Sequence, residues 1–309
     1  MMNYKIKWPK NKKFAFTIFD DTDFSTIKNV SKVYSFLKEI EVLTTKSIWP
    51  LGAFSSENGS TCEDKEYLQW VLELQKKGFE IGFHNASFDN SNRARMEKGL
   101  NRFIKLFGHH PYSFANHDIC KENIYWGDWR LSGINKLIYN FCTSFKKKKY
   151  FEGHDVESEY FWGDLCKSRI QYVRNFVFSE INTLNACPYM PYHDSSKPYV
   201  NYWFASSEGA TVNSFNAMIS EKNQDRLEEE GGCCIMYTHF ANDFVKNGKL
   251  NERFKKLVIR LSKKNGWFVP VNVLLNHLLS FKKETTLSKK NLKKLERKWL
   301  INKILKGSS

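Results

Sequence analysis

The chain has 309 residues, of which 41% are hydrophobic and 16% aromatic, with only 16 Gly and 7 Pro. This composition excludes a disordered chain, a collagen-like repeat and a small disulfide-stapled domain. The formal net charge is +15, but the last 28 residues hold ten Lys or Arg against two Glu. The rest of the chain is only mildly basic, so its charge does not predict a nucleic-acid partner.

Nothing in the sequence predicts secretion or a membrane span. The N-terminal residues lack the apolar core of a secretory signal, and no apolar run approaches the ~18 residues of a transmembrane helix. The seven cysteines, an odd number without a CxxC pair, are typical of buried thiols in a reducing compartment. We therefore expect a cytoplasmic protein.

The first third of the chain predicts alternating strands and helices. Residues 14–19 form a continuous apolar run, typical of a strand buried on both faces. Apolar residues then recur at helical spacing in three segments, over residues 30–40, 67–74 and 96–107. A second short strand is predicted at residues 79–83, between the second and third of these helices.

The alternation of strands and helices returns after a less periodic middle. Within residues 109–200 only the segment 170–181 alternates as a strand does. The remaining predicted elements are a helix at 215–230, a strand at 233–238, a helix at 250–261 and a strand at 267–271. Strands that alternate with helices predict a parallel sheet or barrel covered by helices.

Residues able to bind a metal or move a proton follow three of the predicted strands. Asp20 and Asp21 follow the first, His84 the second and His239 the strand at 233–238. The carboxyl ends of parallel strands carry the ligand site in α/β folds, so we expect these side chains to converge. An Asp and His set suits zinc or another borderline divalent ion. The alternative is that the acidic residues only cap the next helix.

The order of these motifs resembles the polysaccharide deacetylase family, the NodB-homology carbohydrate esterases. The resemblance rests on Asp20-Asp21 after the first strand, residues 78–84 (GFEIGFH), residues 108–114 (GHHPYSF) and residues 237–239 (YTH). It covers most of residues 12–280, as an order of motifs and not as continuous similarity. It implies an α/β fold, a distorted (β/α) barrel, which holds one divalent metal ion and hydrolyses N- or O-acetyl groups on sugars.

The resemblance also implies roles for four residues. Asp20 would be the general base and His239 the general acid, whereas Asp21 and His84 would be metal ligands. We expect the metal to be zinc, with nickel, cobalt and manganese as alternatives.

The sequence departs from the family's pattern in two motifs. The pattern has a second histidine four residues after His84, where this chain has Phe88, and the arginine of the third motif is absent from residues 114–117 (FANH). We predict that His117 supplies the third ligand, because imidazole is the commonest metal ligand. The alternatives are that Asp89 or Asp23 supplies it and that His117 contacts substrate.

Aromatic and polar residues near these motifs are of the kind that bind sugars, since pyranose rings lie on aromatic faces and hydroxyl groups take hydrogen bonds. The candidates for substrate binding are Asn85, Asp89, Asn116, Trp126 and Arg174. An arginine within an apolar strand needs a carboxylate partner or an anionic ligand. Arg174 is therefore expected to bind a substrate carboxylate or to hold the catalytic Asp.

Residues 282–309 differ from the rest of the chain. Leucine, tryptophan and isoleucine recur there at roughly helical spacing among lysines, which predicts a basic amphipathic helix. This helix either packs on the barrel or lies on an anionic membrane at the inner, cytoplasmic face. We therefore divide the chain into a barrel domain, residues 1–281, and a basic tail, residues 282–309.

The resemblance predicts a metal-dependent hydrolase that removes acetyl groups from a sugar of a bacterial surface polysaccharide or of its nucleotide- or lipid-linked precursor. The expected partner is an acetylated glycan and not nucleic acid. One alternative is a catalytically silent, glycan-binding member of the same fold. Another is a glycoside hydrolase that pairs Asp20 with one other carboxylate, from Asp89, Asp155 or Asp164.

Overall fold

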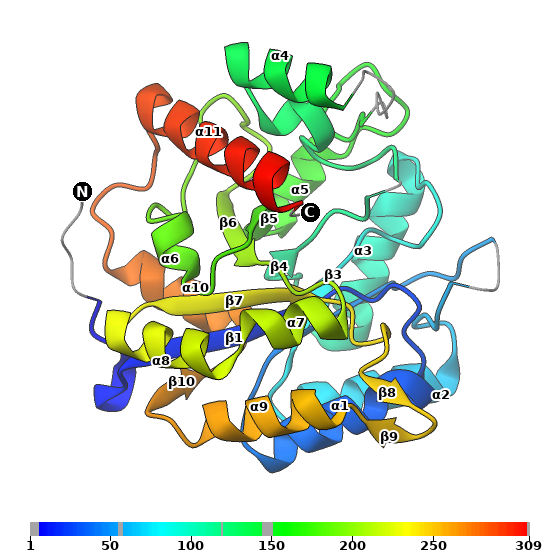
Figure 1. Cartoon of the computed structure of the whole chain (residues 1–309). Helices are drawn as coiled ribbons and strands as arrows, with labels where there is room; N and C mark the ends of the chain where they lie inside the picture. The colour runs from blue at the N-terminus through cyan, green and yellow to red at the C-terminus, as the bar shows by residue number, and fades with distance from the viewer. Residues whose placement is uncertain (1–5, 55–57, 119, 144–150, 308–309) are drawn as a thin grey trace.

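The computed structural model describes residues 6–54, 58–118, 120–143 and 151–307. Its centre is a closed parallel β-barrel surrounded by helices (Figure 1). The barrel strands follow chain order: β1 (Phe14–Asp20), β2 (Thr45–Ile48), β3 (Glu80–Phe83), β4 (Ser113–Phe114), β5 (Tyr172–Phe178), β6 (Tyr202–Ser207) and β7 (Cys233–Thr238). β7 pairs back onto β1, which closes the barrel, and β10 (Gly266–Phe268) pairs with the first half of β1.

Helices follow most of the strands and cover the outside of the barrel (Figure 1). They are α1 (Ile27–Glu39), α2 (Lys65–Lys76), α3 (Arg93–Phe107), α4 (Gly133–Cys142), α5 (Gly163–Arg169), α6 (Thr183–Ala186), α7 (Val212–Met218), α8 (Glu221–Glu230), α9 (Glu252–Ser262), α10 (Val271–Ser280) and α11 (Lys289–Lys306). The smaller elements are the 3-10 turns η1 (Pro9–Asn11) and η2 (Gly127–Arg130) and the hairpin of β8 (Val245–Lys246) and β9 (Lys249–Leu250). Among the described helices, none has the length and apolar character needed to cross a membrane.

The sequence of β1 explains its central position. Successive side chains of a strand point to opposite faces, and every residue of β1 is buried, so both faces must be accepted by the core. Aromatic and aliphatic residues occupy both faces, with Phe14 and Ile18 on one and Phe19 on the other. A strand that lies between the barrel interior and the surrounding helices needs apolar side chains on both faces, which explains the continuous apolar run.

The barrel is distorted where strand pairing is shortest. β3 meets β4 only at Phe83 and Phe114, and β6 meets β7 only at Ser207 and Met236. By contrast, β1 and β7 pair over six consecutive positions. The predicted fold class, a distorted (β/α) barrel with a C-terminal helix, is confirmed.

Several predicted elements differ from those observed. The single helix predicted at residues 215–230 is two helices, α7 and α8, because a turn lets both Phe215 and Leu227 reach the core. The strand predicted at residues 267–271 ends at Phe268, and α10 begins at Val271. The sequence did not predict β2 or β6, whose segments mix polar and apolar residues.

The basic C-terminal segment forms α11, which packs on β5 and α4. Its Trp299 is fully buried, 5.0 Å from the ring of Phe176 and 5.9 Å from that of Tyr139. The division between residues 1–281 and 282–309 stays a prediction, but the helix of the second part covers the core of the first.

Candidate active site

Four strand ends deliver the chemically active side chains to one end of the barrel. Asp20 ends β1 and Asp21 follows it, His84 follows β3, His117 lies in the segment after β4, and His239 follows β7. Since the strands are parallel and closed into a barrel, these loops meet at the same rim. The sequence predicted this convergence for the loops after β1, β3 and β7.

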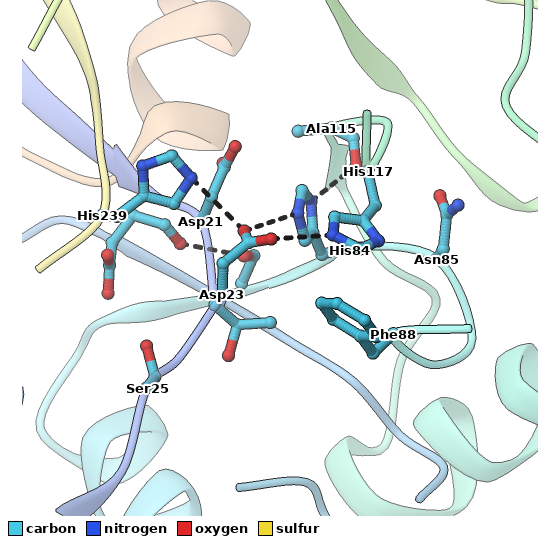
Figure 2. A network of polar contacts seen from close by, with 12 residues as sticks. Asp21, Asp23, Ser25, His84, Asn85, Phe88, Ala115, His117 and His239 are labelled. Carbon is cyan, nitrogen blue, oxygen red and sulfur yellow. Dashed lines mark hydrogen bonds and ion pairs between the residues drawn. The ribbon is translucent and has the colours of Figure 1, made fainter. Parts of the chain in front are cut away.

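The centre of the cluster is Asp23, three residues beyond β1. Its carboxylate oxygens lie 3.1 Å from Nε2 of His84, 2.8 Å from Nε2 of His117 and 3.4 Å from Nε2 of His239. Figure 2 shows the three imidazoles arranged around this carboxylate. One potential ligand atom from each of Asp23, His84 and His117 lies within 4.8 Å of the others, and Asp21, Asp23 and His239 form a second such group.

Hydrogen bonds on the far side of each ring orient the nitrogen atoms of His84 and His117. Nδ1 of His84 lies 2.8 Å from the carbonyl oxygen of Ala115, which only accepts, so Nδ1 carries the proton. The thiol of Cys120 donates to the carbonyl of Phe88, and its sulfur lies 3.3 Å from Nδ1 of His117. In the neutral rings the lone pairs on Nε2 therefore face the carboxylate of Asp23.

This arrangement places acceptor atoms against acceptor atoms, which is unfavourable unless a cation lies at the site. The cation is either a second proton on each ring or a metal ion, and two imidazoles with one carboxylate form a suitable donor set for zinc-like ions. A hydrogen bond from Nδ1 to a backbone carbonyl is also the usual support of a metal-ligating histidine. The residues present therefore fit a divalent ion.

Asp23 and His239 carry opposite charges at neutral pH, because their surroundings shift their pKa values in opposite directions. Burial alone would raise the pKa of Asp23, but the charge of His84 and hydrogen bonds from three imidazoles hold its pKa well below the ordinary value. Burial alone would lower the pKa of His239, yet its hydrogen bond to Asp23 and the charges of Asp21 and Asp23 raise its pKa to about 9. Asp23 is therefore a carboxylate and His239 an imidazolium at neutral pH.

Asp21 is held by a bidentate ion pair with Arg174 of β5. The two guanidinium nitrogens lie 2.8 and 2.5 Å from the two carboxylate oxygens, and both side chains are almost fully buried. The guanidinium also lies over the ring of Tyr237, 4.4 Å from its centroid. Of the two roles predicted for Arg174, the structure supplies the carboxylate partner within the chain.

Asp20 points away from this cluster. Its carboxylate is fully buried, 3.0 Å from Nζ of Lys46 in β2, and accepts hydrogen bonds from the hydroxyl of Tyr34 and the backbone N–H of Phe240. Burial raises its pKa although Lys46 opposes the shift. The neighbouring carboxylates thus lie in different surroundings, because successive residues at a strand end point to opposite faces.

A cavity of about 840 Å³ opens at the cluster. Of the sequence-predicted site residues, seven line it: Asp21, His84, Asn116, His117, Trp126, Arg174 and His239. Asp20, Asn85 and Asp89 do not line it. Asn85 donates to the carboxylate of Glu122 and to Asn123, and it lies apart from the three imidazoles in Figure 2. Asp89 accepts from the backbone N–H of Phe54.

Phe88 stands where the resemblance led us to expect a histidine. Its ring lies 4.9 Å from that of His117, and both contact the indole of Trp49, which also stacks on His84. Phe88 thus supplies no metal ligand and packs instead against His117, the ligand candidate from another loop.

Sequence reasoning missed part of the cavity wall. Asp23 was only one alternative for the third ligand, although it touches all three imidazoles. Tyr139 of α4 and Lys303 of α11 also line the cavity, and no local pattern distinguishes them from ordinary helix residues. Only the packing of these helices over the barrel brings them there.

No protein-family model and no curated protein matches the chain. Solved structures do match. The allantoinase PuuE aligns with 11% identity over 90% of this chain and 94% of its own, with a TM-score of 0.52. A protein of Mycobacterium smegmatis assigned as a polysaccharide deacetylase aligns with 10% identity over 91% and 96%, with a TM-score of 0.48. One of Pseudomonas aeruginosa PAO1, assigned likewise, aligns with 11% identity over 89% and 93%, with a TM-score of 0.47.

At such low identity, structural likeness shows the fold alone. The likeness to PuuE extends over nine tenths of this chain, and the parallel barrel closes between β1 and β7. The resemblance read from the order of the motifs is thus confirmed for the fold. The chain shares the (β/α) barrel fold of PuuE, which is the class of fold that the resemblance implied.

Proposed function

We propose that this protein is a metal-dependent hydrolase that removes acetyl groups from a sugar. The observation that carries the proposal is the set of Asp23, His84 and His117 around one point of a large cavity, with Asp21 and His239 beside it. Two imidazoles and a carboxylate are typical ligands of a catalytic divalent ion, which leaves other coordination positions for water and substrate.

Asp23, His84 and His117 would hold the metal, for which zinc is the first candidate and nickel, cobalt and manganese are alternatives. When bound, the ion would act as a Lewis acid that polarises the acetyl carbonyl group. This assignment replaces Asp21 by Asp23 in the ligand set expected from the sequence, because Asp23 contacts both imidazoles directly.

Asp21 would accept the proton of the attacking water. It lines the cavity, and the fork of Arg174 fixes the position of its carboxylate. Asp20 was expected to have this role, but its carboxylate is turned toward Lys46 and away from the cavity wall. General-base catalysis requires hydrogen-bond reach of the proton that is moved, which favours Asp21.

His239 would donate a proton to the leaving amine or alcohol. Burial alone would lower the pKa of His239, but its hydrogen bond to Asp23 and the nearby charge of Asp21 favour the protonated imidazole. Its Nδ1 lies 3.2 Å from the carbonyl of Ala210, so Nε2 faces the cluster. Addition of water to the acetyl carbonyl, loss of a proton to Asp21 and transfer of a proton from His239 then release acetate and the free sugar amine or hydroxyl group.

The cavity has the size and wall composition for a sugar. Trp126 lines it, with the guanidinium of Arg130 lying 4.2 Å from its ring centroid. Asn116 adds a polar group, although both its amide atoms already bond to the backbone of Ile124. We propose as substrate a sugar of a bacterial surface polysaccharide or of its nucleotide- or lipid-linked precursor, deacetylated in the cytoplasm.

Release of acetate from N-acetylglucosamine oligomers tests this function directly. We expect the protein loaded with zinc to release acetate, and a chelator to stop the reaction. Asp21→Asn and His239→Ala should each lower the rate at least about 100-fold, the usual scale for a general base or acid. Asp89→Asn, a carboxylate outside the cavity lining, is the matched control and should retain the rate. Rates unchanged in Asp21→Asn would remove the proposed base.

The two alternatives predict different outcomes. A silent, glycan-binding member would bind the oligomers without acetate release under any metal. A glycoside hydrolase would cleave the chain in the presence of chelator. For that reading Asp20 would need a partner across the cavity, but Asp164 forms an ion pair with Arg93 and, like Asp89 and Asp155, does not line the cavity.

A further inference from the structure

The helix α4 has its apolar side outward. Its exposed large hydrophobic residues recur at positions i, i+3, i+4 and i+7, and they are Ile134, Leu137, Ile138 and Phe141. The side chains of Leu137 and Phe141 are 67% and 76% exposed, whereas Asn135 and Tyr139 are buried. A helix on the surface of a globular protein normally shows the reverse distribution, and no packing among the described residues explains this face.

Polar contacts fix α4 in this orientation. The buried carboxylate of Glu296 in α11 accepts hydrogen bonds from the backbone N–H and hydroxyl of Ser132 and from the amide of Asn135. On the same side Tyr139 stacks near Trp299. If α4 rotated to bury Leu137 and Phe141, the hydrogen bonds from Ser132 and Asn135 to Glu296 would break, and the buried carboxylate of Glu296 would lose these partners. The apolar face is therefore built to point outward.

α11 packs against α4 and carries exposed apolar and basic residues of its own. Ile301, Ile304 and Leu305 are exposed near its C-terminal end. Arg297 and Lys294, about one and two turns before Ile301, are exposed as well. In Figure 1 the two helices lie side by side above the barrel, which agrees with their contacts. The C-terminal ends of both helices border the cavity, because Cys142 and Lys303 line it.

We propose that the outer faces of α4 and α11 form a surface that binds an anionic lipid membrane. An amphipathic helix with apolar residues and lysines or arginines inserts its apolar side between headgroups while the cations meet anionic lipid. A second copy of the chain is a poorer occupant, since a two-fold contact would bring the same basic residues together. The surface binds membrane whether or not the cavity is catalytic, and it places the cavity beside the bilayer.

Flotation of the full chain with vesicles tests the proposal. We expect binding to vesicles of phosphatidylcholine and phosphatidylglycerol at a ratio of about 7:3, and weak binding to phosphatidylcholine alone, since the cations need anionic lipid. The variant Leu137→Glu/Phe141→Glu should reduce the bound fraction at least about tenfold, because two charges would enter the apolar region. The matched control, Val273→Glu/Phe281→Glu, adds the same charge at exposed apolar residues outside this surface.

A second variant tests the contribution of charge. Lys294→Glu/Arg297→Glu should abolish the preference for anionic vesicles while a thermal melt stays like that of the unaltered protein. The proposal fails if the unaltered chain binds neither vesicle, or if the α4 variant binds as the control does. It also fails if sedimentation finds a dimer that the α4 variant dissociates, because a second copy would then occupy the face.

Discussion

The carboxylate of Asp23 accounts for the geometry of the three histidines around it. Each imidazole turns Nε2 toward Asp23, although the rings come from segments after β3, β4 and β7. Asp21, two residues earlier, forms an ion pair with Arg174, and a ligand atom of its carboxylate also lies within 4.8 Å of those of Asp23 and His239. One short acidic segment thus supplies both a ligand candidate and a separately held proton acceptor.

At the residue scale, we expect the ion pair of Asp20 and Lys46 to stabilise the fold and not to act on substrate. Both side chains are fully buried, so Asp20→Asn leaves the ammonium of Lys46 without its counter-charge. The free energy of unfolding should fall by about 3 to 5 kcal/mol, as it does when one partner of a buried pair is removed. Urea denaturation measures this loss.

The double variant Asp20→Asn/Lys46→Met is the control for this pair. It removes both charges and should recover most of the lost stability. An Asp20→Asn protein that is as stable as the unaltered chain but inactive would return the catalytic role to Asp20.

Arg174 offers a second residue-scale prediction. Lysine cannot reproduce the two parallel hydrogen bonds that the guanidinium gives to Asp21. Arg174→Lys should therefore lower the rate of acetate release about 10- to 100-fold, the scale expected when a catalytic group is slightly misplaced. The bound metal should remain, because Arg174 contacts no proposed ligand. Loss of metal in this variant would mean that Asp21 is a ligand after all.

At the scale of elements, α11 contributes to the core and is more than an appended tail. Trp299 is enclosed by Phe176 and Tyr139, and the guanidinium of Arg130 lies 4.2 Å from its ring centroid. Trp299→Ala should lower the free energy of unfolding by about 3 to 5 kcal/mol. Val273→Ala, at a partly exposed position of α10, is the control and should cost little. A loss below about 1 kcal/mol for Trp299→Ala would make α11 a loosely attached segment.

We expect His154, which lies between α4 and α5, to make the stability of the folded state depend on pH. Its Nδ1 accepts a hydrogen bond from the backbone N–H of Tyr125, its ring packs against those of Tyr125 and Trp129, and burial lowers its pKa from 6.5 to about 4. The folded state therefore binds the proton less tightly than the unfolded state, so stability is present above pH 6.5 and is lost as the pH falls toward 4.

Between pH 7.5 and pH 5, the shifted pKa of His154 should lower the free energy of unfolding by about 2 kcal/mol. Urea denaturation at both values should give a larger decrease for the unaltered chain than for His154→Phe, which has no titrating group. Equal decreases in the two proteins would show that His154 does not cause the acid sensitivity.

Elements with a strong pattern could be predicted from sequence. β1 is a run of buried residues, β7 is buried except for the half-buried Tyr237, and the prediction at residues 233–238 matches β7 (Cys233–Thr238). β2 was missed because its sequence, TKSI, has polar side chains that are buried in pairs: Lys46 meets Asp20, and Thr45 donates to Glu80. Such pairs form between strands that are distant in sequence, so the local hydrophobic pattern of a segment does not predict them.

At the scale of the whole molecule, motif order predicted the fold and the convergence of three loops at one rim. The residues after β1, β3 and β7 do meet, and the structure brings His117 to them. Sequence could not assign which carboxylate faces the cavity, since that depends on how the chain turns after Asp20. It also could not predict the outward apolar face of α4, because a hydrophobic period alone does not tell which side meets the core.

Metal analysis of the purified, full-length protein tests the central claim most directly. We expect close to one divalent ion per chain after loading with zinc, and loss of that ion in Asp23→Asn, His84→Ala and His117→Ala. Asp89→Ala and Asp20→Asn should retain it, because neither residue lines the cavity. An absence of bound metal under every loading condition, or full retention of the metal by Asp23→Asn, would contradict the proposed site.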